Sequence, residues 1–202
     1  MINLNEVAWV KQLWPEHEHY LDVYHHYQLT GARSIFAHGI HLAEKEWRCL
    51  HETGSAIAFC PTSNLFLGSG LFRLPASWQH QVRIGIGSDV GAGTTFSLLR
   101  TLGEAYKVAQ LQSYRLRASE AFYHATLGGA YALRLDDKIG NFQSGKEADL
   151  VVIDPAVTPL QKLRGARCHD VYEQLFVLMT LGDERNISET WVNGEQVWCN
   201  EG

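Results

Sequence analysis

Three short apolar runs, each followed by a helical pattern, dominate the first half of this 202-residue chain. The apolar runs cover residues 34–37, 55–60 and 82–87. The helical patterns that follow them cover residues 43–52, about 71–80 and 95–112. Such alternation is typical of parallel β/α units, because a parallel strand needs a crossover before its neighbour. The sequence therefore predicts an α/β fold with a parallel sheet, preceded by helices over 5–14 and 20–29.

Polar side chains follow each of the three predicted strands. His38 comes after the first strand, Thr62-Ser63-Asn64 after the second, and Asp89 after the third. In parallel β/α folds the reactive residues lie on the loops after the strand carboxyl ends. These residues are therefore the candidates for chemistry, with residues 61–70 expected to form a long loop.

His38 and Asp89 each have a structural alternative. A histidine at a strand end can ligate a metal, hold a substrate carbonyl, or cap a neighbouring backbone group. Asp89 could cap the next helix, but Thr94 and Thr95 lie nearer to the expected helix start and are better caps, which leaves Asp89 for another role. The glycine-rich segment 90–93 lacks the following Lys-Ser/Thr of a phosphate-binding loop.

The other histidines and the cysteines give weaker indications of a functional site. The histidines at positions 17, 19, 25 and 26 do not have the spacing of a ligand set, and we expect a partly solvated face. Cys60 has no implied His–Asp pairing, so a nucleophilic role is not expected. The four cysteines are scattered, which predicts neither disulfides nor a structural zinc site and favours a reducing cytoplasm.

Composition excludes several classes of partner. The net charge of −5 and the lack of a basic block argue against a nucleic-acid surface. No apolar run is long enough to predict a membrane span, and the first ten residues do not have the pattern of a signal peptide.

The sequence changes character near residues 136–142, where turn-forming residues accumulate. We therefore expect a β/α domain over residues 1–138 and a smaller, strand-rich domain over residues 139–202. The second domain should contain a strand at 148–154, a helix at 170–181 and a closing hairpin over 189–198. Asn193-Gly194 lies between two runs of β-formers, which is the pattern of a two-residue hairpin turn.

Several motifs, in order, resemble the amidohydrolase superfamily of metal-dependent hydrolases. They are Phe36–Gly39, Ala58–Asn64, Gly85–Asp89, Ala121–Ala130, Ile139–Asp154 and Thr190–Gly194. Within this superfamily, the loop Cys60–Phe72 is most similar to the guanine deaminase family. The resemblance covers essentially the whole chain.

The resemblance implies a fold, a reaction and two site residues. The fold would be the last three β/α units of a TIM-type (β/α)8 barrel plus part of a small β-sandwich domain. The reaction would be hydrolytic deamination of guanine, a small purine, to xanthine and ammonia in purine salvage. Asp89 would be a ligand of one zinc ion, would handle the proton of the attacking water and would contact substrate. His38 would lie beside the water and the substrate, and Thr62, Ser63 and Asn64 would line the purine pocket or fix its loop. The resemblance also implies a cytoplasmic homodimer, with no nucleic-acid or membrane partner.

The chain departs from the family pattern in two motifs. It contains neither the H-x-H of the first barrel strand nor the H-x-x-E of the fifth. His17-Glu18-His19 matches the H-x-H pattern, but it lies between predicted helices rather than after a buried strand. One ligand cannot hold a catalytic zinc ion, which normally has three protein ligands. We therefore expect the C-terminal portion of a longer enzyme, inactive or nearly so alone, with activity returning if an N-terminal half is supplied in trans.

Two alternatives stay open. A related deaminase or chlorohydrolase could act on another purine, a pterin or a triazine. The chain could also be a non-catalytic remnant that serves in binding or assembly, whose mark would be a stable fold with no affinity for metal or purine.

Overall fold

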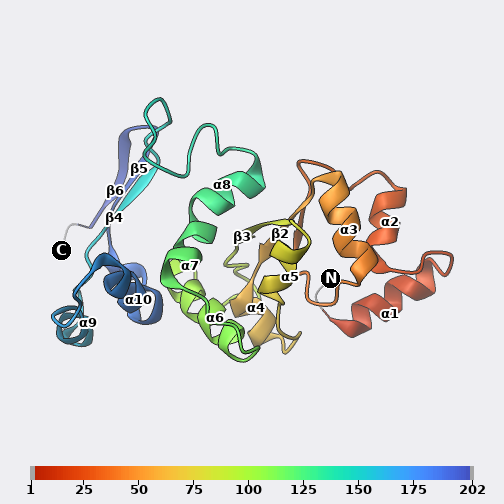
Figure 1. Ribbon diagram of the computed structural model, residues 1–202, viewed down its shortest axis with the longest axis horizontal. Coiled ribbons are helices and arrows are strands. Elements are labelled where there is room, and N and C mark those ends of the chain that lie inside the picture. The colour runs from red at the N-terminus through yellow and green to blue at the C-terminus, as the bar shows by residue number, and fades with distance from the viewer. Residues whose placement is uncertain (1–2, 201–202) are drawn as a thin grey trace.

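The computed structural model describes residues 3–200, and within that range the strands form two separate three-stranded sheets (Figure 1). The first sheet is parallel, in the order β1-β2-β3, and comprises Ile35–Ala37, Ala56–Phe59 and Arg83–Ile86. The second sheet is antiparallel, in the order β4-β5-β6, and comprises Leu150–Ile153, Ile187–Val192 and Glu195–Cys199. The prediction of parallel β/α units is confirmed for the first sheet.

Helices make up most of the remaining structure. They are α1 (Leu4–Leu13), α2 (Tyr20–His26), α3 (Glu44–Thr53), α4 (Pro61–Phe66), α5 (Leu74–Gln79), α6 (Leu98–Gln110), α7 (Ala118–Ala125), α8 (Leu127–Leu133), α9 (Pro159–Gly165) and α10 (Val171–Leu181), with a 3-10 turn η1 at Glu184–Asn186. Among residues 3–200, none of the helices has the length and apolar character needed to cross a bilayer.

The hydrophobic core lies between the parallel sheet and its helices. Ile57 of β2 and Leu50 of α3 are fully buried, and Leu102 of α6 is 1% exposed. Each such side chain contributes about 1.5–3 kcal/mol by leaving water. Helix α8 packs along β3, while α6 and α7 pack against α10 (Figure 1). This packing holds β3 and the loop that follows it in a fixed position.

Two local predictions differ from the structure at the strand ends. The expected loop over 61–70 begins with helix α4, because Pro61 occupies its first turn, where the missing N–H costs nothing. Helix α6 begins at Leu98 and is capped by Ser97, not by Thr94 or Thr95. The Thr95 hydroxyl instead accepts a hydrogen bond from the Ser97 N–H at 3.0 Å, which forms a turn before the helix.

Helices α7 and α8 are separated at Thr126, whose backbone is not helical. Gly128 lies beside this break, and a Cβ there would come within 2.9 Å of the Tyr123 carbonyl oxygen. The Asn193-Gly194 turn between β5 and β6 is as predicted, with both residues at positive φ.

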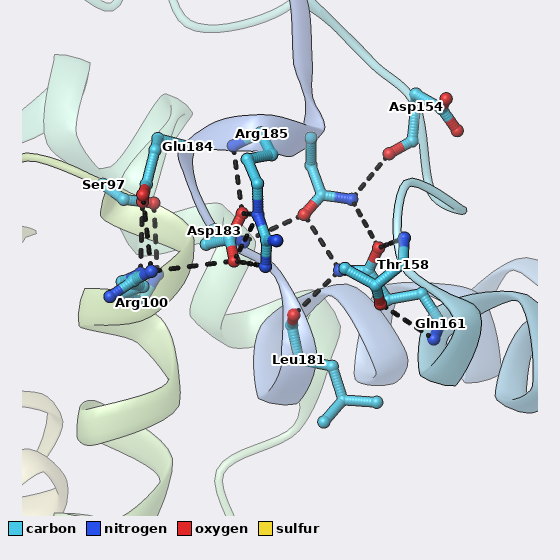
Figure 2. Close-up of polar contacts among 10 residues, drawn as sticks. Ser97, Arg100, Asp154, Thr158, Gln161, Leu181, Asp183, Glu184 and Arg185 are labelled. Atoms are coloured by element: carbon cyan, nitrogen blue, oxygen red, sulfur yellow. Dashed lines mark hydrogen bonds and ion pairs between the residues drawn. The ribbon is translucent and has the colours of Figure 1, made fainter.

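A buried polar network connects α9, α10 and the residues before β5 (Figure 2). Gln161 and Asn186 are both fully buried and exchange hydrogen bonds of 3.0 and 3.2 Å. Gln161 also donates to the Leu181 carbonyl at 2.8 Å, and Asn186 donates to the Asp154 carbonyl at 2.6 Å. Because both side-chain amides are paired, they are buried without the penalty of an unmade hydrogen bond.

Candidate active site

Three side chains with metal-binding or proton-transfer chemistry meet at the carboxyl edge of the parallel sheet. His38 follows β1, Cys60 follows β2 and Asp89 lies three residues beyond β3. One ligand atom from each lies within 4.8 Å of the other two. His38 Nε2 and Asp89 Oδ2 are 3.8 Å apart. The structure thus brings together His38 and Asp89, the two residues proposed from the sequence.

The backbone of both residues is left-handed. His38 has φ +72° and Asp89 has φ +49°. For residues with a Cβ this conformation costs about 1–2 kcal/mol, so local contacts must hold it. The His38 N–H donates to the Ala58 carbonyl of the neighbouring strand at 2.9 Å, and Gly93 donates its N–H to the Asp89 carbonyl at 2.5 Å. A Cβ at Gly93 would collide with the Ser88 carbonyl oxygen, so this turn requires glycine.

Asn64 fixes the orientation of the His38 ring. Its Oδ1 lies 2.8 Å from His38 Nδ1, and the Asn64 side chain is buried in α4. Because an amide oxygen only accepts hydrogen bonds, Nδ1 carries the proton in this contact. In the neutral ring, Nε2 is then an unprotonated acceptor that faces Asp89. Sequence reasoning placed Asn64 only in a loop that could line the pocket, and no local pattern indicated its contact with His38.

Cys60 lies beside this pair as a neutral thiol. Burial, together with the Asp89 carboxylate, raises the pKa of Cys60 to about 11. Its Sγ donates to the Ala58 carbonyl at 3.4 Å. A protonated thiol is a poor nucleophile, which agrees with the expectation from the sequence. Its place at the site was not predicted from the sequence, although Cys60 directly follows the central strand of the sheet.

The other residues considered in the sequence analysis are polar residues of α4 and a group of histidines in and before α2. Thr62 and Ser63 are buried in α4, and the Ser63 hydroxyl donates to the Cys60 carbonyl at 3.3 Å, so it supports the loop. His17 lies 3.7 Å from Glu16, and its ring contacts that of His26 at 5.0 Å. Among residues 3–200, this histidine cluster contributes to no group of three potential metal ligands.

The donor set after β1–β3 fits a zinc ion. His38 offers an imidazole nitrogen and Asp89 a carboxylate oxygen, which are both zinc ligands in proteins, whereas Cys60 would first have to lose its thiol proton. Asp89 offers a carboxylate that is 37% exposed, and the unprotonated Nε2 of His38 points toward it. Both groups can therefore reach a metal ion or a water molecule in front of the sheet.

Comparison with known proteins places the whole chain in one family. The family model described as "Amidohydrolase family" matches residues 3–197. Guanine deaminase of Escherichia coli (strain K12) is 62% identical over 196 residues, which are 97% of this chain and 45% of that protein. The chain thus spans about 45% of the length of this curated relative.

Solved structures give the same pattern. E. coli guanine deaminase superposes with a TM-score of 0.97 at 60% identity, covering 99% of this chain and 47% of that one. A guanine deaminase from C. acetobutylicum with bound guanine has a TM-score of 0.85 at 32% identity, covering 98% and 47%. An adenosine deaminase from Xanthomonas campestris with bound zinc has a TM-score of 0.83 at 28% identity, covering 96% and 43%.

Proposed function

This chain belongs to the amidohydrolase family, and from that premise we propose that it is the C-terminal part of a guanine deaminase. The whole enzyme would convert guanine and water to xanthine and ammonia. The observation that carries the proposal is the pairing of His38 with Asp89 at the carboxyl edge of the sheet, in a chain 62% identical to a guanine deaminase. Its substrate would be a small purine.

The same proposal extends to the architecture. The units β1–α3, β2–α4–α5 and β3–α6 would be the last three β/α units of a (β/α)8 barrel, within a domain over residues 1–138. The antiparallel sheet β4–β6 would belong to a small β-sandwich domain over residues 139–202. Parallel pairing of β1–β3 and the separate antiparallel sheet support this division. We propose a cytoplasmic homodimer for the whole enzyme, on the resemblance alone.

In the proposed reaction, the water oxygen bonds to the carbon that carries the amino group of guanine. The carbon–nitrogen bond then breaks. One water proton is transferred to the amino group, which leaves as ammonia, and the other is transferred to the adjacent ring nitrogen, so that the oxygen remains as the new carbonyl of xanthine. A zinc ion bound by Asp89 would supply Lewis acidity, which lowers the pKa of water toward neutrality. The chain's own residues would supply proton transfer and orientation.

Asp89 would move the proton. Its carboxylate can accept a proton from the attacking water and return it to the departing nitrogen. His38 would orient the reacting oxygen, because its Nε2 accepts a hydrogen bond while Nδ1 is held by Asn64. Once protonated, the same Nε2 can donate to negative charge that develops on oxygen.

The test is a chimera in which this chain replaces the matching segment of E. coli guanine deaminase. We expect the zinc-loaded chimera to deaminate guanine, followed as loss of guanine absorbance, and to prefer guanine over adenine, pterin and triazine substrates. A chimera that folds but does not turn over guanine would contradict the proposal. A preference for adenine, pterin or triazine would assign the chain to a related deaminase or chlorohydrolase. The 202-residue chain with zinc should show little or no turnover, and robust turnover by it alone would refute the proposal that it is only a part.

A further inference from the structure

A second candidate binding site lies between the two halves of the chain, apart from His38 and Asp89. It is a pocket of about 890 Å³ between the α6–α7 connection and the segment that joins α9 to α10. Figure 1 shows α10 beside α6 and α7, with α9 on the far side of α10. Four arginines contribute to its lining, and we refer to it as the arginine pocket: Arg115, Arg117, Arg164 and Arg167. It shares no lining residue with the candidate active site.

The charge of the arginine pocket is opposite to that of the whole chain. The chain has a net charge of −5, yet the pocket lining holds four arginines and only two carboxylates. Both carboxylates are engaged locally. Asp170 accepts the Glu173 N–H at 2.9 Å as the cap of α10, and Glu173 accepts the His169 N–H at 2.8 Å.

The positive charge of the four guanidinium groups is balanced by few carboxylates of the chain. Across residues 3–200, no carboxylate lies within ion-pair distance of any of them, although Arg117 interacts electrostatically with Glu120. All four arginines are exposed. A guanidinium group presents donors in a planar fork that matches a phosphate, and several around one pocket suit a ligand with several negative charges.

Aromatic side chains line the same pocket. Tyr106 and Phe176 pack edge to face with their ring centroids 5.4 Å apart, and Tyr172 is 63% exposed at the start of α10. Aromatic faces and arginine planes both stack on nucleobases. The volume is in the range of pockets that bind small ligands, about 300–1,000 Å³.

We propose that the arginine pocket binds a nucleoside di- or triphosphate. The arginines would hold the phosphates and the aromatic side chains would hold the base. This inference goes beyond the proposed function and does not depend on it, because no catalytic residue takes part.

The test is calorimetric titration of the 202-residue chain with GTP, ATP, inorganic tripolyphosphate and guanosine. We expect saturable binding of a nucleoside triphosphate that is tighter than that of tripolyphosphate or guanosine. The double variant Arg115→Gln/Arg167→Gln, with one change on each side of the pocket, should weaken it at least about tenfold, which corresponds to about 1.4 kcal/mol.

The matched control is Arg33→Gln/Arg48→Gln, which removes the same charge from two exposed arginines outside the pocket. Circular dichroism should show that both double variants fold. Absence of saturable binding, or equal weakening by both variants, would overturn the proposal. Binding of tripolyphosphate as tight as that of the nucleotides would refute a site for the base.

Discussion

His38 Nδ1 lies 2.8 Å from the Oδ1 of Asn64, a residue buried in the helix that follows the neighbouring strand. This contact decides which ring nitrogen faces Asp89. At metal sites, removal of a group that orients a histidine typically changes metal affinity or activity by about 10–100-fold. The pair therefore connects the local fold of α4 with the chemistry proposed at the carboxyl edge of the sheet.

Replacing Asn64 with alanine should release the His38 ring. We expect the nitrogen chemical shifts of the His38 imidazole, measured by NMR on the chain itself, to change from one tautomer to a mixture. In the chimera, guanine turnover should fall by about 10–100-fold. Asn5→Ala, at an exposed position of α1, is the control and should change neither. An unchanged His38 tautomer in Asn64→Ala would show that Asn64 does not orient the ring.

The Cys60 thiol should resist alkylation. Its pKa is raised to about 11, so very little thiolate exists at pH 8, and the side chain is only 3% exposed. We expect iodoacetamide to modify the exposed Cys199 first and Cys60 far more slowly, measured by peptide mass spectrometry. The reaction at Cys60 should accelerate as the pH rises toward 11. Labelling of Cys60 as fast as Cys199 at pH 8 would contradict this environment.

Truncation of Gln161 should destabilise the fold. In Gln161→Ala, the Leu181 carbonyl loses its side-chain donor (Figure 2), and the buried Asn186 side chain loses two of its four hydrogen bonds. A hydrogen bond contributes about 0.5–1.5 kcal/mol, so loss of these bonds should lower the free energy of unfolding in urea by about 1–3 kcal/mol. Gln174→Ala, on the exposed side of α10, should have little effect. Equal stability of the two variants would argue against the network.

Asp183 should make stability depend on pH. Hydrogen bonds from Arg185 hold the pKa of this carboxyl below its usual value. A carboxyl with a lowered folded-state pKa stabilises the fold above its unfolded-state pKa of about 3.9, and that contribution is lost as the pH falls below it. Asp183→Asn should therefore be less stable than the parent at pH 7, and the difference should shrink at pH 3. A difference that is the same at both pH values would exclude this ionisation as its cause.

The positions of the strands and of the hairpin turn could be predicted, because each depends on residues that are adjacent in the sequence. The apolar runs at residues 34–37, 55–60 and 82–87 contain the three parallel strands, and the Asn193-Gly194 turn joins β5 and β6 as predicted. Parallel pairing then accounts for why His38 and Asp89 meet, since carboxyl ends of parallel strands share one edge.

The parts that local sequence could not reveal depend on tertiary contacts. Asn64 meets His38 across 26 positions, and Gln161 meets Asn186 across 25. No periodicity or turn signal encodes such pairs. Helix α9 was missed for a related reason, because it is short and is fixed by its Thr158 cap and by the buried Gln161 side chain.

The most direct test of the proposed function is the effect of Asp89→Asn on guanine turnover by the chimera. We expect a loss of at least about a hundredfold, because the amide can neither take the proton of water nor serve as a carboxylate ligand. Asp137→Asn, at an exposed position outside the site, should leave turnover unchanged. Turnover that survives Asp89→Asn within about threefold of the parent would contradict the role proposed for the His38–Asp89 pair.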